Sequence, residues 1–90
     1  MNIHLGEFVY ALRGRDAGKC FIVMSEDGKF LYLCDGKSRK VESNKKKQIK
    51  HVSFTGCTDS FILSKLTMNE EVTNNEVKRA VRRYKDGKEI

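Results

Sequence analysis

Short apolar stretches separated by turn residues run along the first two thirds of the chain, a pattern that predicts β-strands. The first three stretches, residues 8–12, 19–25 and 29–34, are rich in aromatic and β-branched side chains. Asp27-Gly28 lies between the second and the third stretch. This dipeptide is typical of a type I′ turn, in which both central residues adopt positive φ angles. We therefore expect a β-hairpin here.

Two further strands are predicted after a second turn signal at residues 35–37. Residues 39–42 form a short candidate, and residues 50–54 alternate, which places Val52 and Phe54 on one face. Short strands with frequent turns favour a small barrel. Residues 61–66 are apolar enough for a strand but too few to decide their structure.

A helical period appears in the tail, where four apolar residues share one predicted helix face. They are Val77, Ala80, Val81 and Tyr84. We expect a helix over about residues 74–85, with Thr73 and Glu76 forming a capping box and Gly87 ending it. An isolated helix of this length is marginally stable, so its apolar stripe must pack on the barrel.

The chain length of 90 residues predicts one domain. Within it we expect a barrel at residues 1–56, a connecting segment at 57–72, and a helix with its tail at 73–90. No apolar run approaches the roughly 20 residues of a transmembrane helix. The first residues lack a basic start and a cleavage site typical of secretion signals. We therefore expect a cytoplasmic protein without membrane contact.

Three widely spaced cysteines, without a CxxC pair, argue against a disulfide framework and against a zinc site. Cys20 and Cys34 lie within apolar runs, where a free cysteine acts as a small hydrophobic residue. Neither histidine lies in a pattern with cysteine or aspartate that is typical of a nucleophile and its base. The sequence therefore predicts no catalysis, no cofactor and no metal.

The net charge is +6, from 18 basic and 12 acidic residues, which suggests a polyanionic partner such as nucleic acid. Residues 37–50 contain seven of these basic residues and only one acid. A lysine run is often no more than a solvated face. We favour a binding role, because the run lies in a predicted loop region beside a second basic stretch.

That second stretch is RGRDAGK, residues 13–19, and its pattern has three possible interpretations. A phosphate-binding P-loop is excluded, because only three residues separate Gly14 from Gly18 and a strand follows instead of a helix. A tight turn explains both glycines, with Asp16 accepting hydrogen bonds from loop amides. A binding loop also explains the flanking cations, since glycines allow close approach to phosphates that cations neutralise.

Residues 6–19, followed by an apolar strand, resemble a KOW motif with Gly18 as its central glycine. Residues 14–19, 35–41 and 45–51 resemble, in the same order, the small KOW-domain RNA-binding proteins. These proteins are related to the archaeal and eukaryotic large-subunit ribosomal protein group with an N-terminal KOW domain. The resemblance implies a mostly β fold, a small five-stranded SH3-like barrel with a C-terminal α-helix packed on it. It also implies RNA binding without catalysis.

We therefore expect a non-enzymatic RNA-binding protein, a monomer when free, whose partners are ribosomal RNA and neighbouring ribosomal proteins. The candidate contacts are Arg13, Gly14, Arg15, Gly18, Lys19, Lys37, Arg39, Lys40, Lys45, Lys46, Lys47 and Lys50. The helix adds Arg79, Arg82 and Arg83 as secondary contacts, since guanidinium groups can hold two phosphate oxygens, although a merely solvated face explains them equally well.

The alternative is an SH3-like adaptor whose basic face binds an acidic protein. RNA binding requires the glycine loop and the lysine run on one side of the molecule. An adaptor requires an exposed apolar groove.

Overall fold

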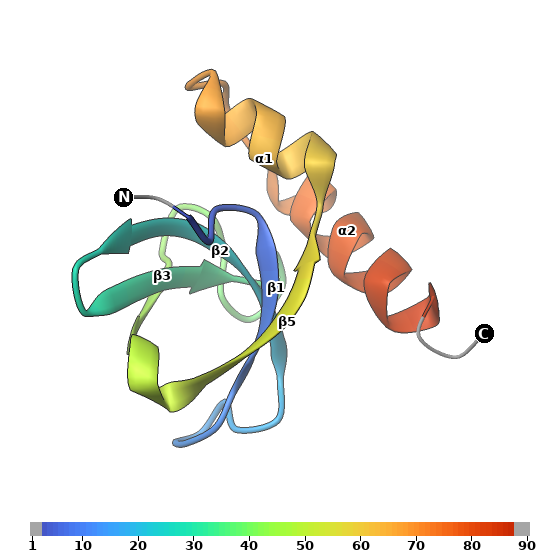
Figure 1. Ribbon diagram of the computed structural model, residues 1–90. Helices are drawn as coiled ribbons and strands as arrows, with labels where there is room; N and C mark the ends of the chain where they lie inside the picture. Colours follow the sequence, from blue (N-terminus) through green and yellow to red (C-terminus); the bar gives the residue numbers. More distant parts are fainter. Residues whose placement is uncertain (1–2, 88–90) are drawn as a thin grey trace.

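The computed structural model describes residues 3–87, which form a small five-stranded antiparallel sheet and two α-helices (Figure 1). The strands are β1 (Glu7–Ala11), β2 (Cys20–Asp27), β3 (Phe30–Cys34), β4 (Lys45–Gln48) and β5 (Val52–Thr58). Their order in the sheet is β4-β3-β2-β1-β5. A 3₁₀ turn, Ile49–His51, joins β4 to β5, and the helices are α1 (Ser60–Thr67) and α2 (Asn74–Gly87). The predicted tail at residues 88–90 lies outside the described part.

The sheet is covered by apolar side chains on both faces. A helix-side core contains Phe8, Cys20, Ile22, Cys34, Ile62, Val72, Val77, Ala80 and Val81. A far-side core contains Val9, Ala11, Phe21, Val23, Leu31, Leu33 and Val52. Successive residues of a strand point to opposite faces, so a strand covered on both sides must be apolar at consecutive positions. This explains the unbroken apolar run at the start of β2.

Helix α2 packs on the sheet through the predicted apolar stripe. Val77, Ala80 and Val81 are buried, and the ring of Tyr84 stacks on that of Phe8 with centroids 4.4 Å apart. The capping box is also present, because Glu76 N donates to Thr73 Oγ1 at 3.2 Å and Thr73 N donates to Glu76 Oε1 at 2.9 Å. The helix extends through Gly87, two residues beyond the predicted end.

The predicted hairpin of β2 and β3 is confirmed, but its turn differs from the type I′ expectation. Asp27 pairs with Phe30, so the central residues are Gly28 and Lys29. Gly28 has a φ angle of 57°, and Lys29 is not among the residues with positive φ. Positive φ at the first central position alone is the type II′ pattern, which suits the same strand twist.

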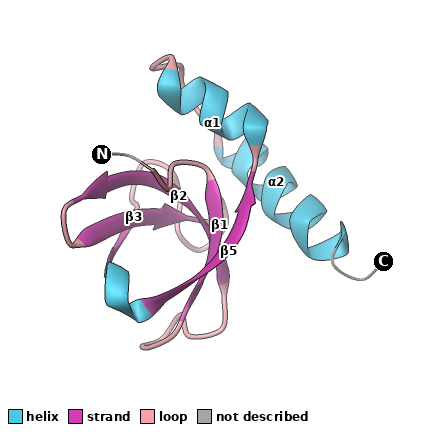
Figure 2. Cartoon of the chain, in the orientation of Figure 1, coloured by secondary structure: helices cyan, strands magenta, loops and turns pink. Residues whose placement is uncertain are grey.

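The fourth strand is not where the sequence predicted it. Residues 39–42 lie in the β3–β4 loop, and the lysine run itself forms β4 (Figure 2). Asp35 Oδ1 accepts hydrogen bonds from Lys37 N at 2.9 Å and from Arg39 N at 2.8 Å. Those amides would otherwise be free to pair with a neighbouring strand. The Asx turn at Asp35 therefore keeps these residues out of a strand, and β4 begins only at Lys45.

The segment beyond the predicted barrel is more ordered than the sequence suggested. Strand β5 begins at Val52 instead of Lys50 and continues to Thr58, and the undecided residues 61–66 belong to α1. Asp59 caps α1, because its Oδ1 accepts a hydrogen bond from Ile62 N at 2.9 Å. Of the helices formed within residues 3–87, none has the length and apolar character of a membrane-spanning segment.

The short turn between β4 and β5 connects the two ends of the strand order. Ile49 N donates to Lys29 O at 2.9 Å, beside β3, whereas Leu12 N donates to His51 O at 2.9 Å, beside β1. Three residues therefore bridge two strands that occupy opposite ends of the sheet order.

Candidate nucleic-acid interface

The glycine loop between β1 and β2 has the backbone that the sequence predicted. Gly14 and Gly18 have φ angles of 83° and 85°, in the region that other residues rarely adopt. Gly18 N donates to Ala11 O at 2.8 Å and Ala17 N donates to Gly14 O at 3.1 Å. The loop is therefore closed by its own backbone, and Arg15 is exposed between the two glycines.

Asp16 does not have the role that was predicted for it. The residue is 5% exposed, and its carboxylate accepts hydrogen bonds from Arg39 Nε at 3.1 Å, Arg39 Nη2 at 2.8 Å and Lys19 Nζ at 3.4 Å. Burial opposes ionisation, but the bonds and charges of Arg39 and Lys19 outweigh it and hold the pKa of Asp16 below its ordinary value. Arg39, which stays a predicted RNA contact, also joins the β3–β4 loop to the β1–β2 loop through this ion pair.

The lysine run is divided between the two faces of β4. Lys46 lies opposite Tyr32, and its Nζ sits 4.3 Å from the centre of the Phe30 ring. Lys45 and Lys47 lie opposite Leu33 and Leu31, whose side chains belong to the far-side core. Directly opposed residues share a face, so the three lysines cannot all act on one surface.

One group of cations gathers around His51, and we call Arg13, Lys47 and Lys50 the loop-end cluster. Lys47 Nζ donates to the Arg13 carbonyl oxygen at 2.7 Å. Partial removal from water, followed by the charges of Arg13, Lys50 and Lys47, lowers the pKa of His51. The glycine loop and the last part of the lysine run are therefore neighbours, as RNA binding through both would require.

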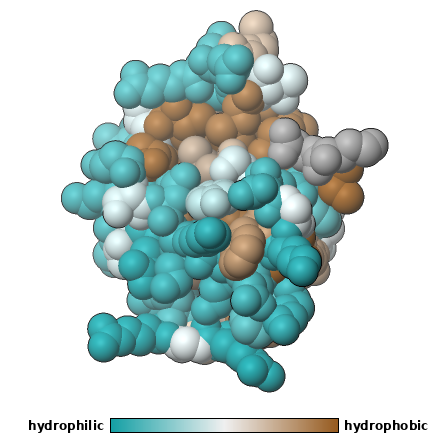
Figure 3. All heavy atoms as spheres, turned by 90° about the vertical axis from the view of Figure 1, so that its left-hand side faces the viewer, coloured by the Kyte–Doolittle hydropathy of each residue, from teal (hydrophilic) through white to brown (hydrophobic). Residues whose placement is uncertain are grey.

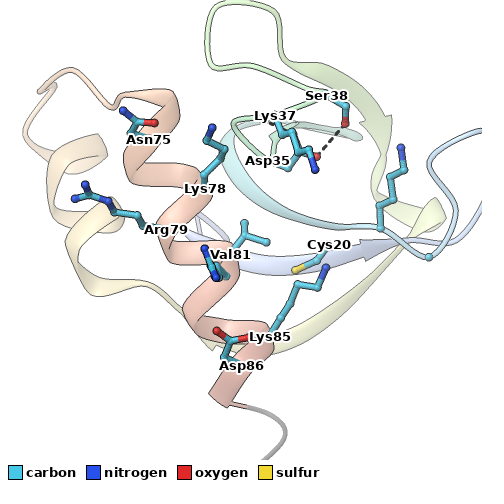
Figure 4. A pocket seen from close by; sticks show the side chains of 13 residues that line it. Cys20, Asp35, Lys37, Ser38, Asn75, Lys78, Arg79, Val81, Lys85 and Asp86 are labelled. Carbon is cyan, nitrogen blue, oxygen red and sulfur yellow. Dashed lines mark hydrogen bonds between the residues drawn. The ribbon is translucent and has the colours of Figure 1, made fainter.

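A second group of cations lines a groove of about 850 Å³, which we call the basic groove (Figure 4). It lies between α2, the end of the β1–β2 loop and the start of the β3–β4 loop. Its lining residues are Gly18, Lys19, Cys20, Asp35, Lys37, Ser38, Asn75, Lys78, Arg79, Val81, Arg82, Lys85 and Asp86. Six of them are basic and two are acidic, so the groove has a net positive charge.

Most of the groove's cations are free to bind an anion. Within residues 3–87, no ion pair involves Lys37, Lys78, Arg82 or Lys85. The carboxylate of Asp35 is already engaged, because Oδ1 accepts from two loop amides and Oδ2 accepts from Ser38 Oγ at 3.0 Å. The side chain of Lys78 points toward the loop that carries Lys37, and that of Arg79 points away from the groove (Figure 4).

Gly36 sets how closely the β3–β4 loop approaches α2. Its φ angle is 76°, and a Cβ there would stand within 3.0 Å of Asn74 O, Lys78 Cγ and Lys78 N. Val41 N also donates to Asn74 Oδ1 at 2.8 Å. These contacts join one wall of the groove to the first turn of the helix that forms the other wall.

The remaining predicted contacts are dispersed. Lys40 is exposed in the β3–β4 loop and lines neither basic site. Arg83 lies on the other flank of α2, where its Nη2 binds Asp59 Oδ2 at 3.1 Å. Lys78 and Lys85 were missing from the candidate contacts, although they lie four residues before and three residues after Arg82. That helical spacing places all three on one face and could have identified them.

Within residues 3–87, no group of histidine, cysteine, aspartate and glutamate side chains is arranged to hold a metal ion. Cys20 and Cys34 are buried, as predicted, whereas Cys57 is exposed. No family model and no curated protein matches the chain. The case for a function therefore rests on the residues and their geometry.

Proposed function

We propose that this protein is a non-enzymatic RNA-binding protein that contacts phosphates through the basic groove and the loop-end cluster. The observation that carries the proposal is the convergence of Lys37, Lys78 and Arg82, from two segments far apart in sequence, without ion-pair partners among residues 3–87. Cations held close together repel one another. A polyanion relieves that repulsion and releases its own counterions on binding.

The chemistry of the groove suits a ligand that presents phosphate oxygens. Phosphate oxygens only accept hydrogen bonds, and the ammonium and guanidinium groups around the groove only donate them. The cations are also distributed over two walls, which suits a chain of phosphates better than one isolated anion. By the KOW resemblance, the favoured target is structured RNA of the large ribosomal subunit, and the protein is a ribosomal or ribosome-associated factor in the cytoplasm.

The strand connections support the SH3-like barrel that the KOW resemblance implies. The edges of a flat five-stranded sheet would be about 19 Å apart, since strands are spaced by about 4.8 Å. Four residue steps, here from Gln48 to Val52, span at most about 14 Å. The sheet must therefore curl to bring β4 toward β5, which is the movement that closes a barrel.

One feature favours a second function, the protein-binding adaptor. Phe61 and Met68, at α1 and just after it, are 51% and 65% exposed. In Figure 3, hydrophilic side chains cover most of the face, but an apolar band crosses its upper half, at the level of α1. Exposed apolar side chains are typical of protein-binding surfaces. A protein partner would place an apolar patch on these side chains and its acidic residues on the basic surface elsewhere.

The two functions can be separated by a binding experiment. Fluorescence anisotropy would compare labelled fragments of large-subunit ribosomal RNA with an acidic polypeptide, poly-glutamate, at several salt concentrations. We expect RNA to bind at least ten times more tightly, with a log–log salt slope that falls by about 0.7 to 0.9 per lost phosphate contact in variants. Equal affinity for poly-glutamate, or no binding of RNA, would overturn the proposal.

A matched pair of variants locates the contact. Lys78→Gln removes a cation from the groove, and Lys29→Gln removes one from the exposed tip of the β2–β3 hairpin. Both changes lower the net charge equally. We expect weaker RNA binding by Lys78→Gln alone. Equal weakening by both variants would show that RNA responds to the net charge of the protein and not to a contact in the groove.

A further inference from the structure

We propose that the basic groove binds a single-stranded segment of RNA, a few nucleotides long, and not a duplex. The inference rests on the proposed RNA-binding function and assigns one part of the surface to one form of RNA. It follows from the placement of the cations on two walls, from the apolar floor between them and from the size of the groove.

The two walls come from different parts of the chain. Lys19 and Lys37 belong to loops at the ends of the sheet strands, and Lys78, Arg82 and Lys85 belong to α2. In Figure 4 the loop that carries Lys37 and the helix that carries Lys78 and Lys85 border a common space. A single strand that runs along this space can be contacted from both sides. A duplex carries its phosphates on the outside of two paired strands. Its phosphates would contact only the outer edges of the groove.

The floor of the groove is apolar. Cys20 and Val81 line it, and they are 4% and 9% exposed. A phosphate has no favourable contact with such a floor, but the face of a base or a ribose does. Proteins that bind single strands combine a positively charged groove for the backbone with aromatic side chains for the bases. This groove has the charged part, and small apolar side chains take the place of aromatic ones on its floor.

The size of the groove agrees with a short segment. Its volume of about 850 Å³ lies within the roughly 300–1,000 Å³ of pockets that enclose small molecules. Such a space holds a few nucleotides with their bases unstacked. Polar groups that could contact base edges are also present, since the exposed amide of Asn75 lies at one end of the groove.

The walls are held in place before any ligand binds. Arg39 connects the β3–β4 loop to buried Asp16 in the β1–β2 loop, and Gly36 rests against Asn74 and Lys78 of α2. A preformed groove loses less conformational freedom when it binds, which offsets part of the ordering cost of a flexible ligand such as a single strand. The residues of the loop-end cluster do not line this groove.

The test compares two RNAs of equal charge, a labelled single-stranded octanucleotide and a four-base-pair hairpin stem closed by a chemical linker. We expect the single strand to bind at least ten times more tightly. The double variant Lys78→Gln, Arg82→Gln should lower single-strand affinity about tenfold and reduce the salt slope by about 1.4, which is two contacts of about 0.7 each on single strands. Lys29→Gln is the control for the loss of charge.

Backbone amide shifts in NMR spectra identify the site directly. The octanucleotide should shift the amides of Gly18, Cys20 and Val81, which line the groove, at ligand concentrations that leave Lys29 unchanged. Equal affinity for the two RNAs, or shifts confined to Arg13, Lys47 and Lys50, would overturn the inference and leave the proposed function standing. No binding of either RNA, or of ribosomal RNA fragments, would overturn both.

Discussion

The buried carboxylate of Asp16 accepts hydrogen bonds from Arg39 Nε and Nη2 at 3.1 and 2.8 Å, across 23 positions of sequence. This two-point contact joins the β1–β2 loop to the β3–β4 loop, and both loops contribute cations to the basic groove. A guanidinium and a carboxylate held by parallel bonds keep a defined relative orientation. The ion pair therefore sets the distance between two parts of the proposed RNA site.

Removing the charge of Asp16 should destabilise the fold. In Asp16→Asn the Arg39 guanidinium loses its anionic partner, and we expect a decrease of about 1–3 kcal/mol in the free energy of unfolding. The value lies below that of a fully buried pair because the Arg39 side chain is 32% exposed. Urea unfolding at neutral pH measures it. An unchanged midpoint would mean that the pair contributes no net stability.

The same ion pair predicts a pH dependence. Burial raises the pKa of Asp16, but the hydrogen bonds and charges of Arg39 and Lys19 lower it by more than burial raises it. The pKa in the folded protein therefore lies below the ordinary 3.8. A lowered folded pKa means that the unfolded chain binds a proton more readily. The contribution of this ion pair to the free energy of unfolding is therefore fully present above the ordinary pKa of aspartate. It is lost as the pH falls through the pKa of Asp16 in the folded protein. Wild type should lose more stability than Asp16→Asn between pH 5 and about pH 2, as acid titration of the urea midpoint would reveal.

Gly36→Ala should disturb the groove as well as the fold. The new Cβ would be strained by the positive φ angle, at a cost of about 1–3 kcal/mol, and would also collide with Asn74 O and Lys78 N. Gly28→Ala is the matched control, since Gly28 also has positive φ but a Cβ there meets nothing within 4 Å. We expect a larger drop in thermal midpoint and weaker RNA binding only for Gly36→Ala. Equal changes in thermal midpoint and RNA affinity for the two variants would show that only the backbone strain at positive φ matters, and not the collision with α2.

RNA bound at the loop-end cluster should raise the pKa of His51. In the free protein partial desolvation and the charges of Arg13, Lys50 and Lys47 hold that pKa below its ordinary 6.5. A phosphate beside the ring would favour the protonated form, so binding takes up a proton and strengthens as the pH falls through the bound pKa. NMR titration of the His51 ring with and without RNA measures the shift. A pKa that stays constant would place the RNA elsewhere.

Thiol reactivity should distinguish the buried and exposed cysteines. Burial, together with the charge of Asp35, raises the pKa of Cys34 to about 12, so almost no thiolate forms near neutral pH. Cys57 is exposed. Iodoacetamide at about pH 8 should modify Cys57 in the folded protein and Cys34 only after unfolding, as peptide mass spectrometry would show. Modification of Cys34 at the rate of Cys57 would contradict its burial.

Features that depend on neighbours in sequence were predictable from the sequence. The capping box at Thr73 and Glu76, the positive φ angles of Gly14 and Gly18, and the β2–β3 hairpin all follow from interactions within a few residues. The apolar stripe of α2 likewise required only the helical period. The type of the hairpin turn was missed, because the pairing of Asp27 with Phe30 depends on register along the whole hairpin.

Features that depend on distant partners were decided by the tertiary structure. The lysine run, by composition a uniform basic segment, became a strand, and the alternation of a strand sent Lys46 to one face and Lys45 and Lys47 to the other. Arg39, indistinguishable in sequence from its basic neighbours, forms an ion pair with Asp16 and remains partly exposed.

The sequence by itself determined the kind of molecule: a small, basic, mostly β protein with a C-terminal helix, in which the cations greatly exceed what its acids can pair. Only the tertiary structure decided which of those cations meet. The basic groove exists because Gly36 lets a loop rest against α2, which brings Lys37 beside Lys78 from 41 positions away. The sequence shows which residues are charged. A binding site also requires these residues to lie close together, and the packing of the folded chain sets the distances between them.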